Sequence, residues 1–412
     1  MILGLALVFL RFSMLHQVLE AKTGVNFRLL YVFGIPALLG VALSGGFNRA
    51  FRGRPAYYWS AFLLWIAICV PFSYWRAASF GCFSSYLRTN LAMLFIIAGL
   101  TVTWPECRRL MTAIALGGVV NLWTAQMFQN DGTVARFGGG VGTVANSNDF
   151  AAHMLLVLSF LLWIALGARS TILRIIALAG VAFGVLTIVR TGSRGALVGL
   201  IVAILFFLWR GTIGQRIGLL VAAPVAVLTI LSLAPADTLQ RITSFSSGNE
   251  EALASRSERE YLFETSLKYT FEFPIFGVGP EQFPAYEGAN NIRPGFTHGR
   301  WQGTHNTFTQ ISSECGIPGL VFFVGGIVST LVLLNATYLE ARRRPNCADI
   351  RNAAFCVMMG YTAFIAAIAF LNFGYFFYFP AMGGLAICIS CAAQEEFRSR
   401  AAARPIPGLM RA

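Results

Sequence analysis

The residues best suited to chemistry in this sequence are two arginines in a short turn between two apolar runs. The turn covers residues 190–195, and the runs extend over about 172–189 and 196–208. Each run is long enough to cross most or all of a bilayer as a helix. An arginine near mid-bilayer costs roughly 2.5–3.5 kcal/mol on insertion scales. We therefore expect Arg190 and Arg194 at the membrane surface or in a polar cavity below it, where a guanidinium group can bind phosphate through two parallel hydrogen bonds.

A histidine provides the second candidate for chemistry. His305 and Asn306 stand where the chain enters another apolar run, and His298 lies shortly before them. A histidine titrates near neutral pH and can act as a general base. Beside arginines on the same side of the membrane, His305 would complete an acid–base and anion-binding site. The other two histidines, His16 and His153, are expected to be packed and hydrogen-bonded.

The composition indicates a polytopic membrane protein. The chain has 412 residues, of which 56% are hydrophobic and only 12% are charged, and its mean hydropathy is +0.66. A soluble domain of this length needs many more charges to cover its surface. The formal net charge of +13 is typical of basic cytoplasmic loops, so we expect no nucleic-acid partner. The eight cysteines are scattered and lie mostly within apolar runs, so we expect no metal site.

The apolar runs predict an all-α transmembrane bundle of about twelve spans. They lie near 1–11, 29–46, 57–73, 84–103, 109–127, 149–168, 172–189, 195–209, 214–234, 308–337, 353–371 and 374–393. Every second connection carries arginines, as does the C-terminal tail: Arg49, Arg52, Arg54, Arg108, Arg109, Arg169, Arg174, Arg210, Arg216, Arg342, Arg343, Arg344, Arg351, Arg398, Arg400, Arg404 and Arg411. The positive-inside rule then predicts that both termini are cytoplasmic.

The remaining connections face outward, and the longest of them divides the chain. We therefore expect three parts: N-terminal spans over 1–234, a loop over 235–307, and C-terminal spans with a tail over 308–412. A loop of this length in a compact protein is expected to have structure and function of its own. Mixed apolar and charged residues over 250–273 predict a helix on the membrane face or over a cavity. Pro274 would end that helix.

Arginines on the outward side are exceptions to the charge rule and are therefore informative. They include Arg190, Arg194, Arg241, Arg256, Arg259, Arg293 and Arg300. For any single one, a solvated or acid-paired arginine is the simpler interpretation. The pair in the tight turn is harder to explain in that way. A cluster of this kind at the membrane surface suits the diphosphate of a lipid-linked substrate.

Polar residues also begin the span near 149–168. Residues 146–149 read Asn-Ser-Asn-Asp, and Asn and Asp are favoured as helix N-caps. Asn148 is a candidate substrate contact in this stretch. Other chemistries lack their motifs, since the sequence has no Walker lysine motif, no GxSxG elbow, no HExxH and no DxD pair.

Several short motifs resemble those of the O-antigen ligase and polymerase superfamily. The turn at residues 191–196 resembles its Ser-Arg-Gly signature. Residues 304–306, with Glu314 downstream, resemble its His-Asn…Glu-x-Gly-x-x-Gly motif. Residues 274–279 match its Pro-x-x-Gly-x-Gly turn. Together the motifs cover about residues 141–320 in the family's order.

The resemblance implies a bacterial inner-membrane glycosyltransferase of GT-C-like fold, with its active site facing the periplasm. Such enzymes move a glycan from undecaprenyl diphosphate to an acceptor hydroxyl, without a metal or other cofactor and with inversion. Carried over by motif, Arg194 would bind the diphosphate together with a loop-helix arginine, for which Arg259 is favoured over Arg256. His305 would activate the acceptor hydroxyl, and Asn306 and Glu314 would support the site.

Three functions agree with these motifs. The first is a ligase that transfers the glycan to lipid A-core or a similar glycolipid. The second is a polymerase of repeat units or an oligosaccharyltransferase that acts on protein. The third is a transporter of lipid-linked sugars, which would use the arginines for binding only and has no need of a base at residue 305.

Overall fold

The computed structural model describes residues 1–130, 137–233, 250–292 and 298–402, and these residues form helices and connecting turns without a strand. The N-terminal helices are α1 (Ile2–Ser13), α2 (Leu15–Thr23), α3 (Leu29–Leu43), α4 (Gly46–Ala50), α5 (Arg54–Cys69), the 3₁₀ turn η1 (Val70–Phe72), α6 (Arg76–Ser85), the π-helix η2 (Tyr86–Leu91), α7 (Ala92–Leu100) and α8 (Trp104–Asn130).

The chain continues through the 3₁₀ turn η3 (Gly142–Val144), α9 (Ser147–Gly167), α10 (Thr171–Arg190), α11 (Arg194–Arg210) and α12 (Ile213–Leu233). Then follow α14 (Glu250–Glu272), α15 (Phe283–Asn290), α16 (Thr307–Arg343), α17 (Ala348–Ile368) and α18 (Tyr378–Ala402). The helix predicted over 250–273 is thus present as α14, and it ends just before Pro274 as expected.

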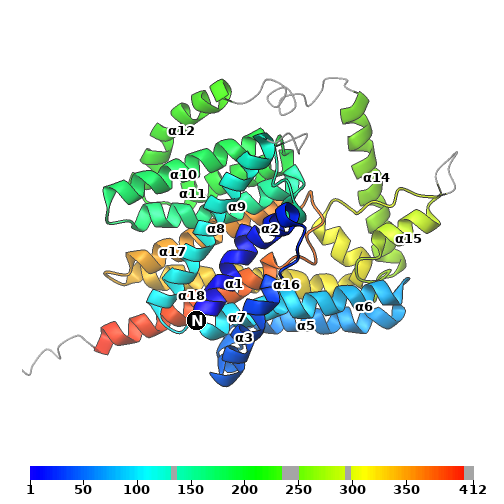
Figure 1. Cartoon of the computed structure of the whole chain (residues 1–412), viewed down its shortest axis with the longest axis horizontal. Helices are drawn as coiled ribbons and strands as arrows, with labels where there is room; N and C mark the ends of the chain where they lie inside the picture. Colours follow the sequence, from blue (N-terminus) through cyan, green and yellow to red (C-terminus); the bar gives the residue numbers. More distant parts are fainter. Residues whose placement is uncertain (131–136, 234–249, 293–297, 403–412) are drawn as a thin grey trace, which may run out of the picture.

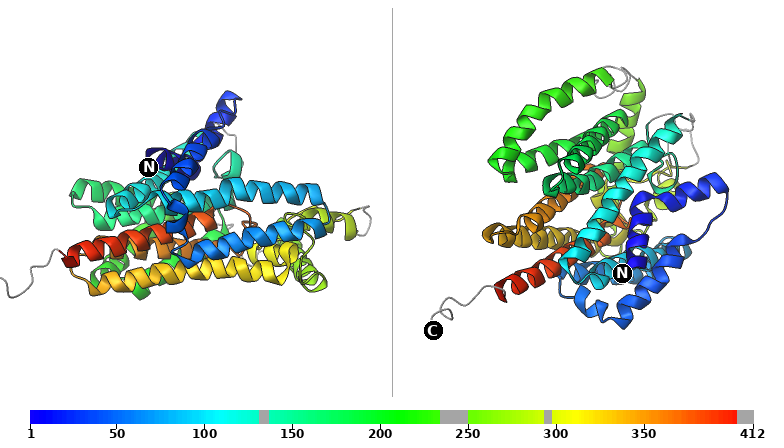
Figure 2. Two further views of the ribbon diagram at one scale, coloured as in Figure 1. Left: turned by 90° about the horizontal axis from the view of Figure 1, so that it is seen from below. Right: turned by 60° about the vertical axis from the view of Figure 1, so that its left-hand side comes forward.

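Most helices run lengthwise in one bundle around α16 and α17. Helix α16 packs against α5, α17 and α18, and α17 packs against α9 and α11. Aromatic side chains fill the centre, where the Trp59 ring lies 5.5 Å from that of Phe323, and Phe323 lies 4.8 Å from Phe379. Figure 1 shows α14 and α15 together at the right-hand end of the bundle and the end of α18 at the left. In Figure 2 the yellow helix α16 extends along nearly the whole bundle.

Seven of the described helices are long and apolar enough to cross a membrane: α5 with η1, α6 with η2 and α7, α8, α9, α10, α16 and α17. The bent pair α1 and α2 would make an eighth. The expectation of about twelve spans is therefore not confirmed. Among the helices placed in the other predicted spans, α3 and α11 have only 15 and 17 residues, which is short for a hydrocarbon core about 30 Å thick.

Polar side chains begin three of these helices. Asn146 caps α9 by accepting a hydrogen bond from the backbone N–H of Asn148, which confirms that this polar stretch starts a helix. Ser193 caps α11 and Asn306 caps α16 in the same way. Such caps satisfy N–H groups that the helix leaves without partners and typically stabilise it by about 1 kcal/mol.

Helix α16 is broken at Gly316, and the turn over residues 274–280 fills the break. Gly316 has φ 68° and ψ −176°, and Pro318 follows it without a backbone donor. The N–H groups of Val278 and Gly279 donate to carbonyl oxygens of residues 313 and 314 at 2.9 and 3.0 Å, and Ile317 donates to Pro274 at 2.8 Å. The turn at residues 274–280 and the stretch around Gly316, which are far apart in the sequence, are therefore held together by these backbone hydrogen bonds.

We predict that Gly316→Ala lowers the melting temperature of the detergent-solubilised protein by several degrees. An alanine Cβ would overlap the carbonyl oxygen of Ile275, and alanine is strained at a φ of +68°, so the cost is on the order of 1–3 kcal/mol. Gly81→Ala is the matched control, because nothing lies within 4 Å of its added Cβ. Equal melting temperatures for the two variants would contradict this close packing at Gly316.

Candidate active site

The two loop helices α14 and α15 lie on the first half of α16. Helix α14 is joined to α16 by a hydrogen bond of 2.7 Å between the hydroxyls of Thr270 and Ser312. Glu314, which is 1% exposed, accepts the backbone N–H groups of Glu281 and Phe283 at 3.2 Å each. These contacts fix the start of α15. The described partners of Glu314 are thus structural, and its predicted contact with substrate stays a prediction.

A second buried carboxylate holds the loop together. Glu287 is 0% exposed and accepts the backbone N–H groups of Arg300 and Trp301 at 2.8 and 3.0 Å. It also accepts the Tyr261 hydroxyl of α14 at 3.1 Å, and the Arg300 guanidinium stacks 4.1 Å from the Tyr261 ring. Glu287 therefore fixes the segment that leads into His305 against both loop helices.

The loop segment ends at His305, whose backbone is held in an unusual conformation. Its φ is +51°, a region that residues other than glycine seldom occupy and that often marks a functional site. Its N–H donates to the side-chain oxygen of Asn372 at 2.8 Å. The adjoining Thr307 hydroxyl donates to the Leu371 carbonyl at 2.8 Å. The backbone of His305 is thus fixed by the turn between α17 and α18.

The charges that act on His305 come from α14. Burial and the nearby positive charge of Arg259 lower the pKa of His305, and the carboxylate of Glu258 opposes them by raising it. A lowered pKa keeps the imidazole neutral near pH 7, which is the form that can accept a proton. Arg259 is thus the arginine of α14 whose charge acts on His305. Arg256 and Arg259 are both exposed on this helix, and the preference for Arg259 as a phosphate contact stays a prediction.

Arg194 lies at the same end of the bundle. Ser193 caps α11, so Arg194 is the first residue of that helix. A Cβ built on Gly195 would lie 3.2 Å from the Phe370 side chain, and only one residue separates Phe370 from Asn372, the partner of His305. Successive Cα atoms are about 3.8 Å apart. The two predicted motifs are therefore neighbours on either side of one short turn.

The other predicted contacts have varied surroundings. The Arg190 guanidinium lies 4.7 Å from the Phe137 ring centroid, a cation–π contact that links the turn to the loop before α9. His298 is exposed, with its Nδ1 2.7 Å from the Gly299 carbonyl oxygen. Two further outward arginines of the sequence, Arg241 and Arg293, lie outside the described residues.

Three helices begin at this end of the bundle and direct their N-termini toward it. Asn148 lies in the first turn of α9, Arg194 in that of α11, and Asn306 caps α16 by accepting the N–H groups of Phe308 and Thr309 at 2.9 and 3.1 Å. A helix N-terminus carries a partial positive charge and favours anions. Together with Arg194 and Arg259, these termini make this region a candidate site for a phosphate-bearing substrate.

Sequence reasoning missed Asn372 and Glu287. Asn372 appears in the sequence only as part of a minimal connection, and Glu287 as one acid in a long loop. Neither residue has a local signal, because each contacts residues that are brought near it only by the fold. A surplus of polar side chains at the ends of apolar runs is the one feature that could have drawn attention to Asn372.

Part of the chain matches a known family. Residues 179–324 match the family model Wzy_C, described as O-antigen ligase. The matched stretch contains Arg194, Arg259 and His305, and it confirms the resemblance to the O-antigen ligase superfamily over about a third of the chain. The search of curated proteins gave no match.

We predict that Glu258→Gln lowers the pKa of His305 further, because it removes the charge that favours the imidazolium ion. Arg259→Gln should raise that pKa, because it removes a repelling charge. The chain has four histidines, so NMR titration of histidine-labelled protein can resolve them. Glu264→Gln, an exposed site on the same helix, is the matched control. Unchanged His305 titration in both variants would contradict this arrangement of charges.

Proposed function

From its O-antigen ligase domain, we propose that this chain is a glycosyltransferase of the ligase and polymerase type. In this proposal it moves a glycan from undecaprenyl diphosphate to an acceptor hydroxyl at the periplasmic face of the bacterial inner membrane. The observation that carries the proposal concerns His305. Burial and the nearby charge of Arg259 lower its pKa, so that its imidazole is uncharged near pH 7. The proximity of the Arg194 turn across residues 370–372 supports the proposal further.

The arginines would bind the diphosphate of the donor. A diphosphate is a good leaving group that gains negative charge on the bridging oxygen as the glycosidic bond breaks. Arg194 and Arg259 would stabilise that charge through charge-assisted hydrogen bonds. The N-termini of α11 and α16 add to the positive potential without any acid having to be protonated.

His305 would act on the acceptor. Its neutral imidazole would take the proton of the acceptor hydroxyl while the oxygen attacks the anomeric carbon from the face opposite the diphosphate. One carbon–oxygen bond forms, the bond to the phosphate oxygen breaks, and the configuration inverts. The backbone contact with Asn372 would hold the imidazole in position for this step, which is where much of the rate advantage of an oriented base arises.

The loop helices would exclude water. Hydrolysis competes with transfer whenever an activated glycan meets water, so a cover over the site is expected. Helix α14 is fixed to α16 by the Thr270 contact and to α15 through Glu287. Helix α14 would therefore form a fixed side of the site near His305, and its Arg259 would have a fixed position there.

The acceptor distinguishes the functions within this superfamily. A glycolipid acceptor would make the chain a ligase, a growing glycan would make it a polymerase, and a hydroxyl of a protein would make it an oligosaccharyltransferase. Mass spectrometry of lipopolysaccharide, free polymer and glycoproteins from a deletion strain would identify the product that is lost.

We predict that His305→Ala abolishes glycan transfer in vitro while binding of the lipid-linked donor is retained. His16→Ala, on α2, is the matched control and should transfer normally. In the unmodified protein, activity should persist as the pH falls through about 6.5, the ordinary histidine value, because the pKa of His305 is lowered. Unchanged turnover in His305→Ala would reject the role of His305 as a base, whereas donor binding without any transfer by the unmodified protein would favour a transporter.

We predict that Arg194→Ala raises the donor KM by roughly tenfold to a hundredfold, the equivalent of one lost hydrogen bond to a charged group. Arg76→Ala, an exposed arginine at the start of α6, is the control for loss of one positive charge in a predicted outward connection. A normal donor KM in Arg194→Ala, with the protein still folded by size-exclusion chromatography, would reject the phosphate assignment.

A further inference from the structure

A small pocket lies at the opposite end of the helices that carry the candidate active site. Three arginines line it: Arg210 at the end of α11, Arg342 near the end of α16 and Arg351 near the start of α17. Arg194 begins the helix that Arg210 ends, so at about 1.5 Å per residue roughly 24 Å of helix separates them. The pocket is therefore distinct from the candidate active site. The positive-inside rule predicts that this end of the bundle faces the cytoplasm.

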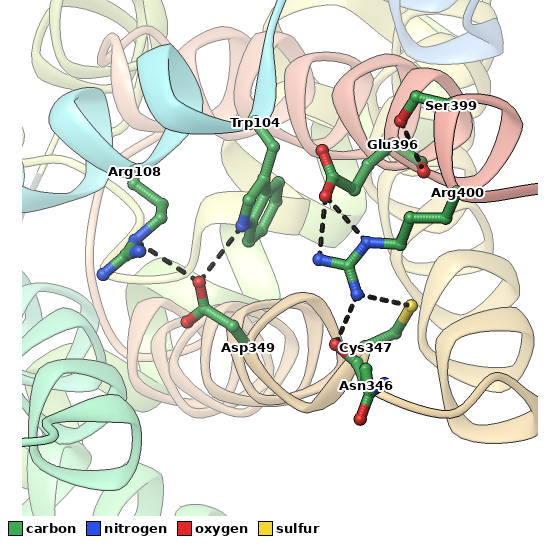
Figure 3. A network of polar contacts seen from close by, with 8 residues as sticks. All are labelled: Trp104, Arg108, Asn346, Cys347, Asp349, Glu396, Ser399 and Arg400. Carbon is green, nitrogen blue, oxygen red and sulfur yellow. Dashed lines mark hydrogen bonds and ion pairs between the residues drawn. The ribbon is translucent and has the colours of Figure 1, made fainter. Parts of the chain in front are cut away.

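Three acidic side chains at this end are engaged outside the pocket. Figure 3 shows Asp349 in contact with Arg108 and Trp104, and Glu396 with Arg400. On α16, Glu340 pairs with Arg344 at 2.7 Å. The pocket itself is lined without an aspartate or glutamate. Over the described part of the chain, none of its three arginines takes part in an ion pair.

Part of the pocket is preorganised. The Arg210 guanidinium donates to the side-chain oxygen of Asn335 at 2.6 Å and lies 5.4 Å from the centroid of the Tyr338 ring. The Tyr338 hydroxyl donates back to the Arg210 carbonyl at 3.3 Å. Arg210 is thus held in place between α11 and α16, while its charge remains without a carboxylate partner.

The size and surroundings of the pocket favour a lipid headgroup. Its volume is about 80 Å³, far below the roughly 300 Å³ at which pockets for drug-sized ligands begin. A phosphate group is of a suitable size. Beside the pocket, Trp209 and Ile213 are 66% and 75% exposed, and such apolar side chains suit contact with acyl chains.

We propose that this arginine pocket binds the phosphate of an anionic phospholipid of the phosphatidylglycerol or cardiolipin class. Basic pockets between transmembrane helices on the cytoplasmic side are suited to such headgroups. Three guanidinium groups around a cavity without acids provide the charge, and the flanking apolar surface accommodates the chains. A bound lipid would join the ends of α11, α16 and α17, the same helices that position Arg194, His305 and the turn at Asn372.

The test is lipid retention by the full-length protein. The protein is reconstituted in phosphatidylcholine nanodiscs with increasing phosphatidylglycerol, released, and examined by native mass spectrometry. The double variant Arg342→Gln with Arg351→Gln should retain phosphatidylglycerol about tenfold less than the unmodified protein. The double variant Arg343→Gln with Arg398→Gln removes the same charge from exposed positions at the same end and should retain it normally.

Two results would overturn the proposal. Equal retention in both double variants would show that general positive charge, and not the pocket, holds the lipid. Thermal stabilisation by inorganic phosphate in pure phosphatidylcholine that equals the stabilisation by phosphatidylglycerol would assign the pocket to free phosphate. Because the readout is lipid binding, the test is independent of glycan transfer.

Discussion

The candidate site depends on the break in α16 at Gly316 and the turn that fills it. A broken transmembrane helix leaves backbone groups that must find partners inside the membrane protein. The turn over residues 274–280 supplies those partners and so fixes the end of α14 and the start of α15 against α16. Helix α14 carries Arg259, and α16 begins two residues after His305. The contacts at the break therefore determine the position of Arg259 relative to His305.

Arginine serves different purposes at the two ends of the bundle. Near His305, Arg259 contributes a charge that favours the neutral imidazole, and in the proposed function it would act with Arg194 to bind a diphosphate. At the other end, Arg108, Arg344 and Arg400 pair with carboxylates, whereas the three arginines of the pocket meet none among the described residues. At that end, the positions of the carboxylates therefore distinguish the arginines that form ion pairs from those that line the pocket.

Local features were predictable from the sequence, and contacts between distant segments were not. Asn146 caps α9 and Pro274 ends α14 as expected, because capping and proline chemistry act within a few residues. The family motifs correctly identified the region that matches the O-antigen ligase domain. Asn372 and Glu287 could not be predicted, since their partners are brought together only by the fold. The count of twelve spans is not confirmed, because some of the predicted spans, such as α3, are short apolar helices among the described residues.

The most direct test of the account is a cryo-electron microscopy structure of the protein with an undecaprenyl diphosphate analogue bound. We predict that the diphosphate lies between Arg194 and Arg259, with the His305 imidazole near the anomeric carbon. A diphosphate bound elsewhere, for example among Arg210, Arg342 and Arg351 at the opposite end, with the His305 region empty, would contradict it.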